Sequence, residues 1–151
     1  MSSSKPQQTL NLLAQAAEAK IYKQGDIIIK DRVSKGYRHP ILDKKMIKQR
    51  TKREKSILEK ANKLIDSPLP EQNRGESIIR MPFIEGKKLS DSLEQLNWRE
   101  LCKQIGNNIA ILHDNNIIHG DLTTSNMILV DNSKNKSNSN LSNQKLSRDI
   151  I

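Results

Sequence analysis

The chain has 151 residues, a formal net charge of +9 and a single cysteine. This length suits one domain with one moderate core, and a content of 34% hydrophobic and 3% aromatic residues means that Ile, Leu and Ala must build that core. No apolar run approaches the roughly 20 residues of a membrane helix. The polar residues 1–8 hold no signal core, so we expect a flexible N-terminus and a cytoplasmic protein. Cys102 has no partner for a disulfide and is expected to be a small core residue.

Three short segments, 9–14, 19–22 and 27–33, have the composition of β-strands, and the turn residues 24–26 join the last two. We predict a small antiparallel sheet. On its third strand, three isoleucines lead directly into Lys30. A lysine at the end of an apolar strand is often a surface residue whose stem lies on apolar neighbours, and a phosphate-binding lysine is the alternative.

A long helix is predicted from about Ile41 to Ile65, between two prolines. Its apolar positions recur at spacings of seven and four, and this periodicity places Glu54 on the same inward face. A lone buried carboxylate is energetically expensive, so Glu54 should have a cationic partner. We expect that partner to be Lys30, and a surface pair with Arg50, four residues earlier, is the alternative.

Most of the positive charge lies in residues 30–60, which contain twelve Lys and Arg but only four acidic residues. A run of charge is usually the solvated face of a helix, and a nucleic-acid-binding surface is the alternative. Tyr37 is the one aromatic residue in this region, so no series of aromatic residues that would stack on bases alternates with the basic ones. Both interpretations of this region stay open.

The next segments connect the long helix to a second one. Residues 77–84 have the composition of a strand that Pro82 interrupts, which favours a sheet edge or a crossover between two parts of the fold. Residues 85–88 are predicted to be a linker. Residues 97–100, Asn-Trp-Arg-Glu, match a capping box, in which the first and last side chains close the first turn of a helix. The apolar stripe of this second helix comprises Leu101, Ile105, Ile109 and Leu112.

The second helix leads into the octapeptide His119-Gly120-Asp121-Leu122-Thr123-Thr124-Ser125-Asn126. Apolar residues on both sides predict a strand–loop–strand hairpin that presents His119, Asp121 and Asn126 along one edge. An Asp followed by an Asn five positions later is the pattern of the kinase catalytic loop. There the Asp accepts a proton from the substrate hydroxyl and the Asn binds a metal ion. An ordinary polar hairpin loop is the alternative.

Together these segments resemble the kinase subunit of the KEOPS (EKC) complex, a family of small atypical kinases and ATPases. Residues 35–40, Lys-Gly-Tyr-Arg-His-Pro, and 118–126, Ile-His-Gly-Asp-Leu-Thr-Thr-Ser-Asn, carry the resemblance most specifically. Residues 29–32, 50–54 and 81–86 support it, the last of these as the family's hinge. RIO kinases and aminoglycoside-type phosphotransferases have similar catalytic loops, and residues 35–40 separate this chain from them.

The resemblance implies an α+β, protein-kinase-like fold with a small antiparallel-sheet lobe, one long helix and the beginning of a helical large lobe. Residues 9–86 would form the small lobe and hinge, and residues 87–130 the part of the large lobe that carries the catalytic loop. Residues 131–151 are rich in Asn, Ser and Lys, so we expect a low-complexity, disordered tail in which Ile150 and Ile151 could begin a strand.

By position, the resemblance also implies a binding site for ATP. Lys30 would bind the phosphates, Glu54 would orient Lys30, and Gln15 would begin the phosphate loop. The adenine would meet the backbone of Pro82 and Ile84. Proline lacks an N–H, but its carbonyl can still accept a hydrogen bond from the adenine amino group.

The same resemblance implies that Asp121 is the catalytic base or orients a water molecule, and that Asn126 is a ligand of magnesium. The family's role is ATP hydrolysis or Ser/Thr phosphorylation that supports threonylcarbamoylation of tRNA. Its partners are the complex's threonylcarbamoyl-transferase subunit and a small regulatory subunit. The basic region 30–60 would then contribute to a surface that faces tRNA.

The chain departs from the family pattern in three places. The phosphate-loop pattern Gln-Gly-Ala-Glu-Ala appears here with Ala16 in place of the glycine, which removes the residue best able to take a positive φ. Residues 67–79 look shortened, which would remove part of a strand. No Asp-Phe-Gly motif, the source of the principal magnesium ligand in kinases, occurs in the sequence. We therefore expect a truncated or split kinase, and two functions stay open: an ATP-dependent enzyme, or a non-catalytic module that binds KEOPS subunits or tRNA.

Overall fold

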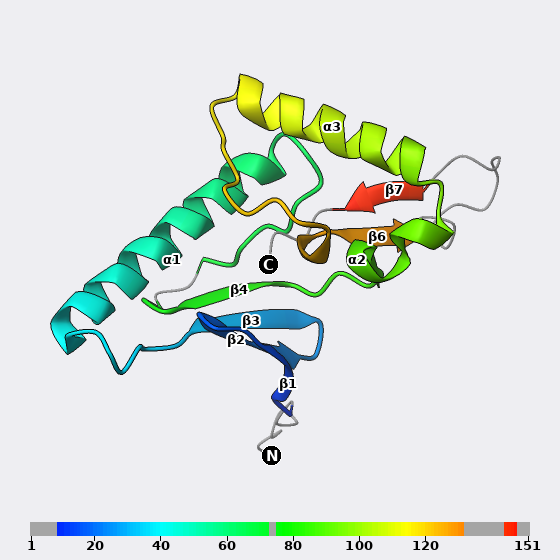
Figure 1. The fold of residues 1–151 in the computed structure, drawn as a ribbon. Coiled ribbons are helices and arrows are strands. Elements are labelled where there is room, and N and C mark those ends of the chain that lie inside the picture. The colour runs from blue at the N-terminus through cyan, green and yellow to red at the C-terminus, as the bar shows by residue number, and fades with distance from the viewer. Residues whose placement is uncertain (1–8, 73–74, 132–143, 148–151) are drawn as a thin grey trace, which may run out of the picture. The chain divides into compact units, whose positions relative to one another are not determined.

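The computed structural model describes residues 9–72, 75–131 and 144–147, and the chain divides into two compact units (Figure 1). The first unit takes residues 1–55 and 70–83, and the second takes residues 56–69 and 84–151. In chain order the elements are β1 (Asn11–Gln15), β2 (Ala19–Gln24), β3 (Ile27–Arg32), α1 (Pro40–Asn62), β4 (Ile78–Pro82), β5 (Lys87–Lys88), α2 (Leu89–Ser92), η1 (Leu93–Gln95), α3 (Trp98–Asp114), η2 (Thr124–Asn126), β6 (Ile128–Asp131) and β7 (Gln144–Ser147).

The first unit is built on an antiparallel sheet with the strand order β1-β2-β3-β4, which confirms the predicted sheet. The register places Lys30 opposite Ile21 on β2 and Ile79 on β4, so these three side chains share one face. Ile21 and Ile79 are buried. Lys30 is therefore a cation set in a row of apolar neighbours. β4 is an edge strand that ends at Pro82, as the proline predicts.

A tight turn joins β2 to β3, as the turn residues predict. Gly25 takes a positive φ of 59°, as the first central residue of a type II′ hairpin turn does. The carbonyl of Asp26 accepts a hydrogen bond of 2.8 Å from the N–H of Phe83. This bond fastens the end of β4 to the turn.

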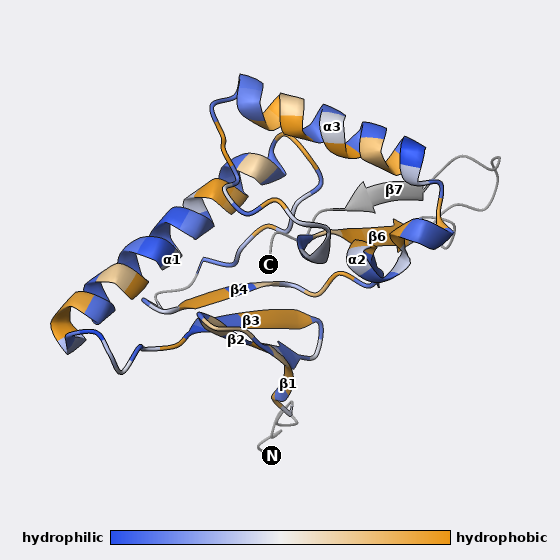
Figure 2. Ribbon diagram, in the orientation of Figure 1, coloured by the Kyte–Doolittle hydropathy of each residue, from blue (hydrophilic) through white to orange (hydrophobic). Residues whose placement is uncertain are grey.

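α1 confirms the predicted long helix, although it ends at Asn62. Its inward positions follow a helical spacing, and Asp43, Thr51 and Leu58 are 1%, 2% and 0% exposed. The middle of α1, residues 48–56, holds only polar and charged residues, which appear as a hydrophilic stretch in Figure 2. The inward positions of this stretch are therefore polar: Glu54 pairs with Lys30, whereas the buried hydroxyl of Thr51 has no hydrogen-bond partner among the described residues.

The second unit has its core around α3. One cluster of buried residues comprises Leu89, Leu101, Met127 and Leu129. Another comprises Ala61, Ile65, Leu112 and Ile117. The predicted apolar stripe of α3 is thus buried at its two ends, Leu101 and Leu112. β6 pairs with β5 on one side and β7 on the other.

Three expectations for this unit were wrong. Residues 87–88 of the predicted linker form β5, because Gly86 lets the backbone approach β6 closely. Asn97 is the N-cap residue of α3 but makes no capping hydrogen bond with its side chain. Cys102 is exposed, because it follows the buried Leu101 by one residue, roughly 100° around the helix.

Several expectations fall on residues that the structure does not describe. They are the expected flexibility of residues 1–8, most of the predicted tail, and the expected strand start at Ile150 and Ile151. Within that tail, residues 144–147 form β7 and pair with β6. Of the helices described, none is long and apolar enough to span a membrane.

Candidate functional site

The first group of candidate residues centres on Lys30 in β3. Its Nζ donates to Oε1 of Glu54 in α1 at 2.8 Å, and the two side chains are only 13% and 15% exposed. The pair forms because Lys30 lies on the apolar face of the sheet and requires an anion there. The predicted contact is confirmed, and its role in nucleotide binding stays a prediction.

Arg32 also binds Glu54, and the sequence analysis missed it. Its Nη2 donates to Oε2 of Glu54, so that one carboxylate holds two cations. Arg32 follows Lys30 by two residues, and side chains two apart on a strand share a face. This spacing is the signal that could have revealed Arg32. The Nε of Arg32 is buried and has no hydrogen-bond partner in the described part of the chain.

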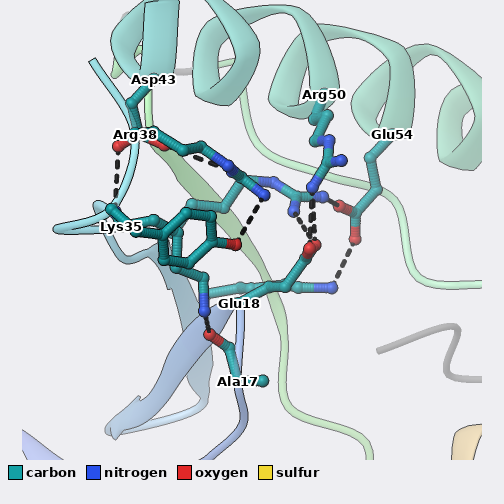
Figure 3. A network of polar contacts seen from close by, with 10 residues as sticks. Ala17, Glu18, Lys35, Arg38, Asp43, Arg50 and Glu54 are labelled. Atoms are coloured by element: carbon teal, nitrogen blue, oxygen red, sulfur yellow. Dashed lines mark hydrogen bonds and ion pairs between the residues drawn. The ribbon is translucent and has the colours of Figure 1, made fainter. Parts of the chain in front are cut away.

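Glu18, in the turn after β1, is the second acid of this network (Figure 3). Both of its carboxylate oxygens accept from Nη1 of Arg50, at 2.8 and 2.9 Å, and one lies 3.7 Å from Nη1 of Arg32. The hydrogen bond from Arg50 is the main reason that the pKa of Glu18 lies below its ordinary value, and burial acts in the opposite direction. Arg50 thus pairs with Glu18, and the alternative pairing with Glu54 is wrong.

The turn at residues 16–18 is the segment expected to be the phosphate loop. The N–H of Ala16 donates to the carbonyl of Ala19 at 2.9 Å and closes the turn. Among the described residues other than glycine, only Asn116 has a positive φ, so Ala16 fits this turn without strain. Gln15 ends β1 with an exposed side chain.

Asp43, in the first turn of α1, holds the segment 35–40 that contributes to the resemblance. Its buried carboxylate accepts from the Ser34 hydroxyl at 2.6 Å, the Lys35 N–H at 3.0 Å and the Arg38 guanidinium at 3.3 Å. The Ser34 hydrogen bond is the largest of the effects that hold the pKa of Asp43 below its ordinary value. The side chain of Lys35 donates to the carbonyl of Ala17, so this segment also contacts the turn after β1 (Figure 3).

The second group of candidate residues lies in the loop before β6. The Asn126 side-chain amide donates to the backbone carbonyl of Asp121 at 3.0 Å and to its Oδ2 at 3.2 Å. The Asp121 N–H donates to Nδ1 of His119 at 3.0 Å. The structure brings Asp121 and Asn126 together, and their catalytic roles stay predictions.

The loop does not belong to the predicted hairpin, because no strand precedes it. α3 ends in a Schellman motif, in which Asn116 takes a φ of 58° and its N–H donates to the carbonyl of His113 at 2.9 Å. The N–H of Ile117 donates to the carbonyl of Leu112 at 2.8 Å. Both Ile117 and Leu112 are buried in one cluster. A helix end, not a strand, therefore positions the loop.

The residues expected to meet adenine, Pro82 and Ile84, lie on either side of Phe83, after which the first unit ends. No cluster of three or more His, Cys, Asp or Glu side chains that could hold a metal occurs among the described residues. Asp121 and Asn126 offer oxygen ligands from two side chains. Such a small set suits magnesium, which usually keeps waters and phosphate oxygens as its other ligands.

Comparison with known proteins identifies relatives over most of the chain. The RIO domain family matches residues 12–136. The KEOPS complex subunit Bud32 of Pyrococcus abyssi is 41% identical over 135 residues, which are 80% of this chain and 61% of that protein. The EKC/KEOPS complex subunit bud32 of Dictyostelium discoideum is 42% identical over 132 residues, 78% of this chain and 52% of that protein. A probable bifunctional tRNA threonylcarbamoyladenosine biosynthesis protein of Methanothermobacter thermautotrophicus is 39% identical over 79% of this chain and 23% of its own.

Among solved structures, WbdD is similar to this chain, with a TM-score of 0.58 in one structure and 0.57 in a complex with the kinase inhibitor LY294002. The match covers 83% of this chain and 30% of WbdD at 15% identity, so it bears on the fold alone. The predicted α+β, protein-kinase-like fold is confirmed, as is the resemblance to the KEOPS kinase subunits. The chain spans 61% of the Pyrococcus protein and 52% of the Dictyostelium protein.

Proposed function

Because the chain belongs to the RIO domain family, we propose that it binds ATP and magnesium and acts as part of a KEOPS-type Ser/Thr kinase or ATPase. The observation that carries this proposal is the contact between Lys30 and Glu54, since a lysine on the third strand held by a helix carboxylate is the arrangement that kinases require for phosphate binding. In this arrangement the ammonium group of Lys30 is already oriented before nucleotide arrives.

Each candidate residue near Lys30 has a distinct task in this proposal. Lys30 binds the α- and β-phosphates, and Glu54 fixes the direction of its side chain. Gln15 borders the turn that receives the phosphates. Pro82 and Ile84 offer backbone groups to the adenine, the carbonyl being the acceptor that Pro82 still has. Residues 9–86 form the small lobe and hinge, and residues 87–130 the part of the large lobe with the catalytic loop.

In the catalytic loop, Asp121 is the proposed base or water-orienting group. Its carboxylate is exposed, so a substrate hydroxyl or a water molecule can reach it. The bond from Asn126 uses Oδ2 of Asp121 and leaves the Asn126 side-chain oxygen available as a magnesium ligand. Magnesium, when bound, neutralises charge on the phosphate oxygens.

The proposed partners follow from the names of the relatives. The relatives from Pyrococcus and Dictyostelium are named as KEOPS subunits, which supports binding of this chain to other subunits of that complex. The resemblance in the sequence makes the threonylcarbamoyl-transferase subunit and a small regulatory subunit the proposed partners. The alternative is a non-catalytic module that binds KEOPS subunits, which the names of these relatives fit equally well.

A tRNA-binding face on α1 is a further part of the proposal. Exposed basic side chains project from the helix at Lys44, Lys45, Lys52 and Arg53. Tyr37, just before the helix, is 79% exposed, and the Arg38 guanidinium lies 5.2 Å from the centre of its ring. Basic side chains bind phosphates and an exposed aromatic ring stacks on bases. The Methanothermobacter relative is named for tRNA threonylcarbamoyladenosine biosynthesis, which makes tRNA the nucleic acid to test.

Magnesium-dependent ATP turnover separates the enzyme from the binding module. The assay compares the purified protein with Asp121→Asn, which keeps the shape of the side chain and removes its charge. Turnover that this change abolishes supports the enzyme. ATP binding without turnover, together with co-purification of a KEOPS subunit by both proteins, supports the binding module. Failure to bind ATP would contradict the proposed function.

A further inference from the structure

We propose that Glu18 is a positioning residue, which holds Arg32 and thereby leaves one oxygen of Glu54 to Lys30. This inference rests on the proposed function, because it assigns a task to a residue beside the phosphate-binding lysine. It also makes a claim about the free protein that can be tested without nucleotide.

Two cations share the carboxylate of Glu54. Lys30 takes Oε1 of Glu54 and Arg32 takes Oε2. A guanidinium prefers a bidentate contact, in which two parallel N–H groups donate to both oxygens of a carboxylate, and a lysine cannot make this contact. In a direct competition for Glu54, Arg32 would therefore displace Lys30.

The Nε–H group of Arg32 is the second donor that a bidentate contact with Glu54 would use. Nε lies on the same edge of the guanidinium as Nη2, the group bound to Glu54, and it is buried without a hydrogen-bond partner in the described residues. An unpartnered buried donor costs free energy, so a second interaction must hold the Arg32 side chain in this conformation. The side chain of Arg32 is only 12% exposed, so water offers little compensation.

Glu18 provides this second interaction, on the side of the Arg32 guanidinium that faces away from Glu54. Its carboxylate lies 3.7 Å from Nη1 of Arg32, the nitrogen that does not contact Glu54. Arg50 in turn fixes Glu18 with two hydrogen bonds of 2.8 and 2.9 Å, and Figure 3 shows Arg50 and Glu54 extending from the same helix. Arg32 is thus drawn toward two acids at once, and Glu54 stays shared.

The test measures how fast an amine-reactive acetylating reagent modifies Lys30 in the free protein, by mass spectrometry. Glu18→Gln should raise the rate about two- to fivefold, because a weak ion pair of roughly 0.5–1 kcal/mol is removed and Arg32 competes for Glu54. Adding Arg32→Gln to Glu18→Gln should restore the slow rate, because the competitor is gone. A residue with a merely structural role would not give this restoration.

The matched control is Glu76→Gln, which breaks another ion pair of α1, the 2.6 Å contact between Lys48 and Glu76. This pair has no link to Glu54, so the modification rate of Lys30 should not change. If Glu18→Gln leaves that rate unchanged, or if the double variant reacts as fast as Glu18→Gln alone, the inference is overturned.

Titration with ATP and magnesium separates this inference from the proposed function. We expect Glu18→Gln to weaken ATP binding about two- to fivefold and the double variant to recover part of the loss. If the unmodified protein fails to bind ATP but the acetylation rate of Lys30 changes in the variants as described, the positioning role of Glu18 is supported and the proposed function is contradicted. If the protein binds ATP but the acetylation rate of Lys30 is the same in all variants, the proposed function is supported and the positioning role is contradicted.

Discussion

Nζ of Lys30 lies 2.8 Å from Oε1 of Glu54, and the other oxygen of that carboxylate binds Arg32. Both cations project from the apolar face of the sheet and share this acid, and Arg32 also lies 3.7 Å from Glu18. The orientation of Lys30 and the stability of the fold are therefore coupled at Glu54.

Glu54→Gln should destabilise the protein by about 1–3 kcal/mol, because two mostly buried cations lose the carboxylate that they share and Lys30 keeps only a neutral amide. Urea unfolding at neutral pH measures the change. Glu76→Gln is the control, since its pair with Lys48 is exposed and should contribute less than about 1 kcal/mol. Equal losses in the two variants would contradict the account.

Asp43 should make stability depend on pH below about 4. The hydrogen bonds from Ser34, the Lys35 backbone and Arg38 lower the pKa of Asp43 in the folded protein relative to the unfolded chain. Its contribution is therefore fully present above the unfolded value of roughly 4 and is lost as the pH falls through the lowered folded value. Asp43→Asn should lower the free energy of unfolding at pH 7, and this free energy should then fall less steeply below about pH 4 than in the unmodified protein. Parallel pH curves for the two proteins would show that Asp43 has no such role.

Asn116 should tolerate glycine but not a β-branched residue. Its φ of 58° completes the Schellman motif that leads into the loop before β6. We expect Asn116→Gly to leave the melting temperature unchanged or slightly raised, and Asn116→Val to cost about 1–2 kcal/mol. Thermal unfolding of both variants tests this, and an equally stable Asn116→Val would contradict the assigned cap.

Substitution by alanine should destabilise the protein at Gly86 and stabilise it at Gly106. A Cβ on Gly86 would lie 2.5 Å from the carbonyl oxygen of Leu129 and would also collide with Ile128. Gly86→Ala should cost about 1–3 kcal/mol, because the backbone of β6 must move. Gly106 lies within α3 with nothing near its Cβ position, so Gly106→Ala should stabilise by about 0.5–1 kcal/mol. Unfolding in urea compares the two, and a neutral Gly86→Ala would disprove the close approach.

The sequence was sufficient for the Lys30–Glu54 pair because two periodicities converge on it. A strand places Lys30 among apolar neighbours, and a helical repeat places Glu54 on an inward face. The predicted hairpin failed for the opposite reason. Ile117 suited a strand by composition, but it closes α3 and packs beside Leu112, which a local pattern cannot reveal.

Glu18 and Arg32 were missed because their importance depends on pairing at long range. Glu18 precedes β2 by a single residue and meets Arg50 across 32 positions of sequence. No local spacing links a turn residue to a helix residue at that distance. The period-two relation between Lys30 and Arg32 was available in the sequence, and it becomes informative once the register of β3 is known.

The most direct test of the proposed function is calorimetric titration of the protein with ATP and magnesium, compared with Lys30→Met and with Lys48→Met as a control from α1. We predict that the unmodified protein and Lys48→Met bind ATP with equal affinity, and that Lys30→Met loses about tenfold or more, since a charge-assisted phosphate contact is worth roughly 1.5–3 kcal/mol. Equal affinity of Lys30→Met and the unmodified protein, or no binding by any of the three, would contradict the account.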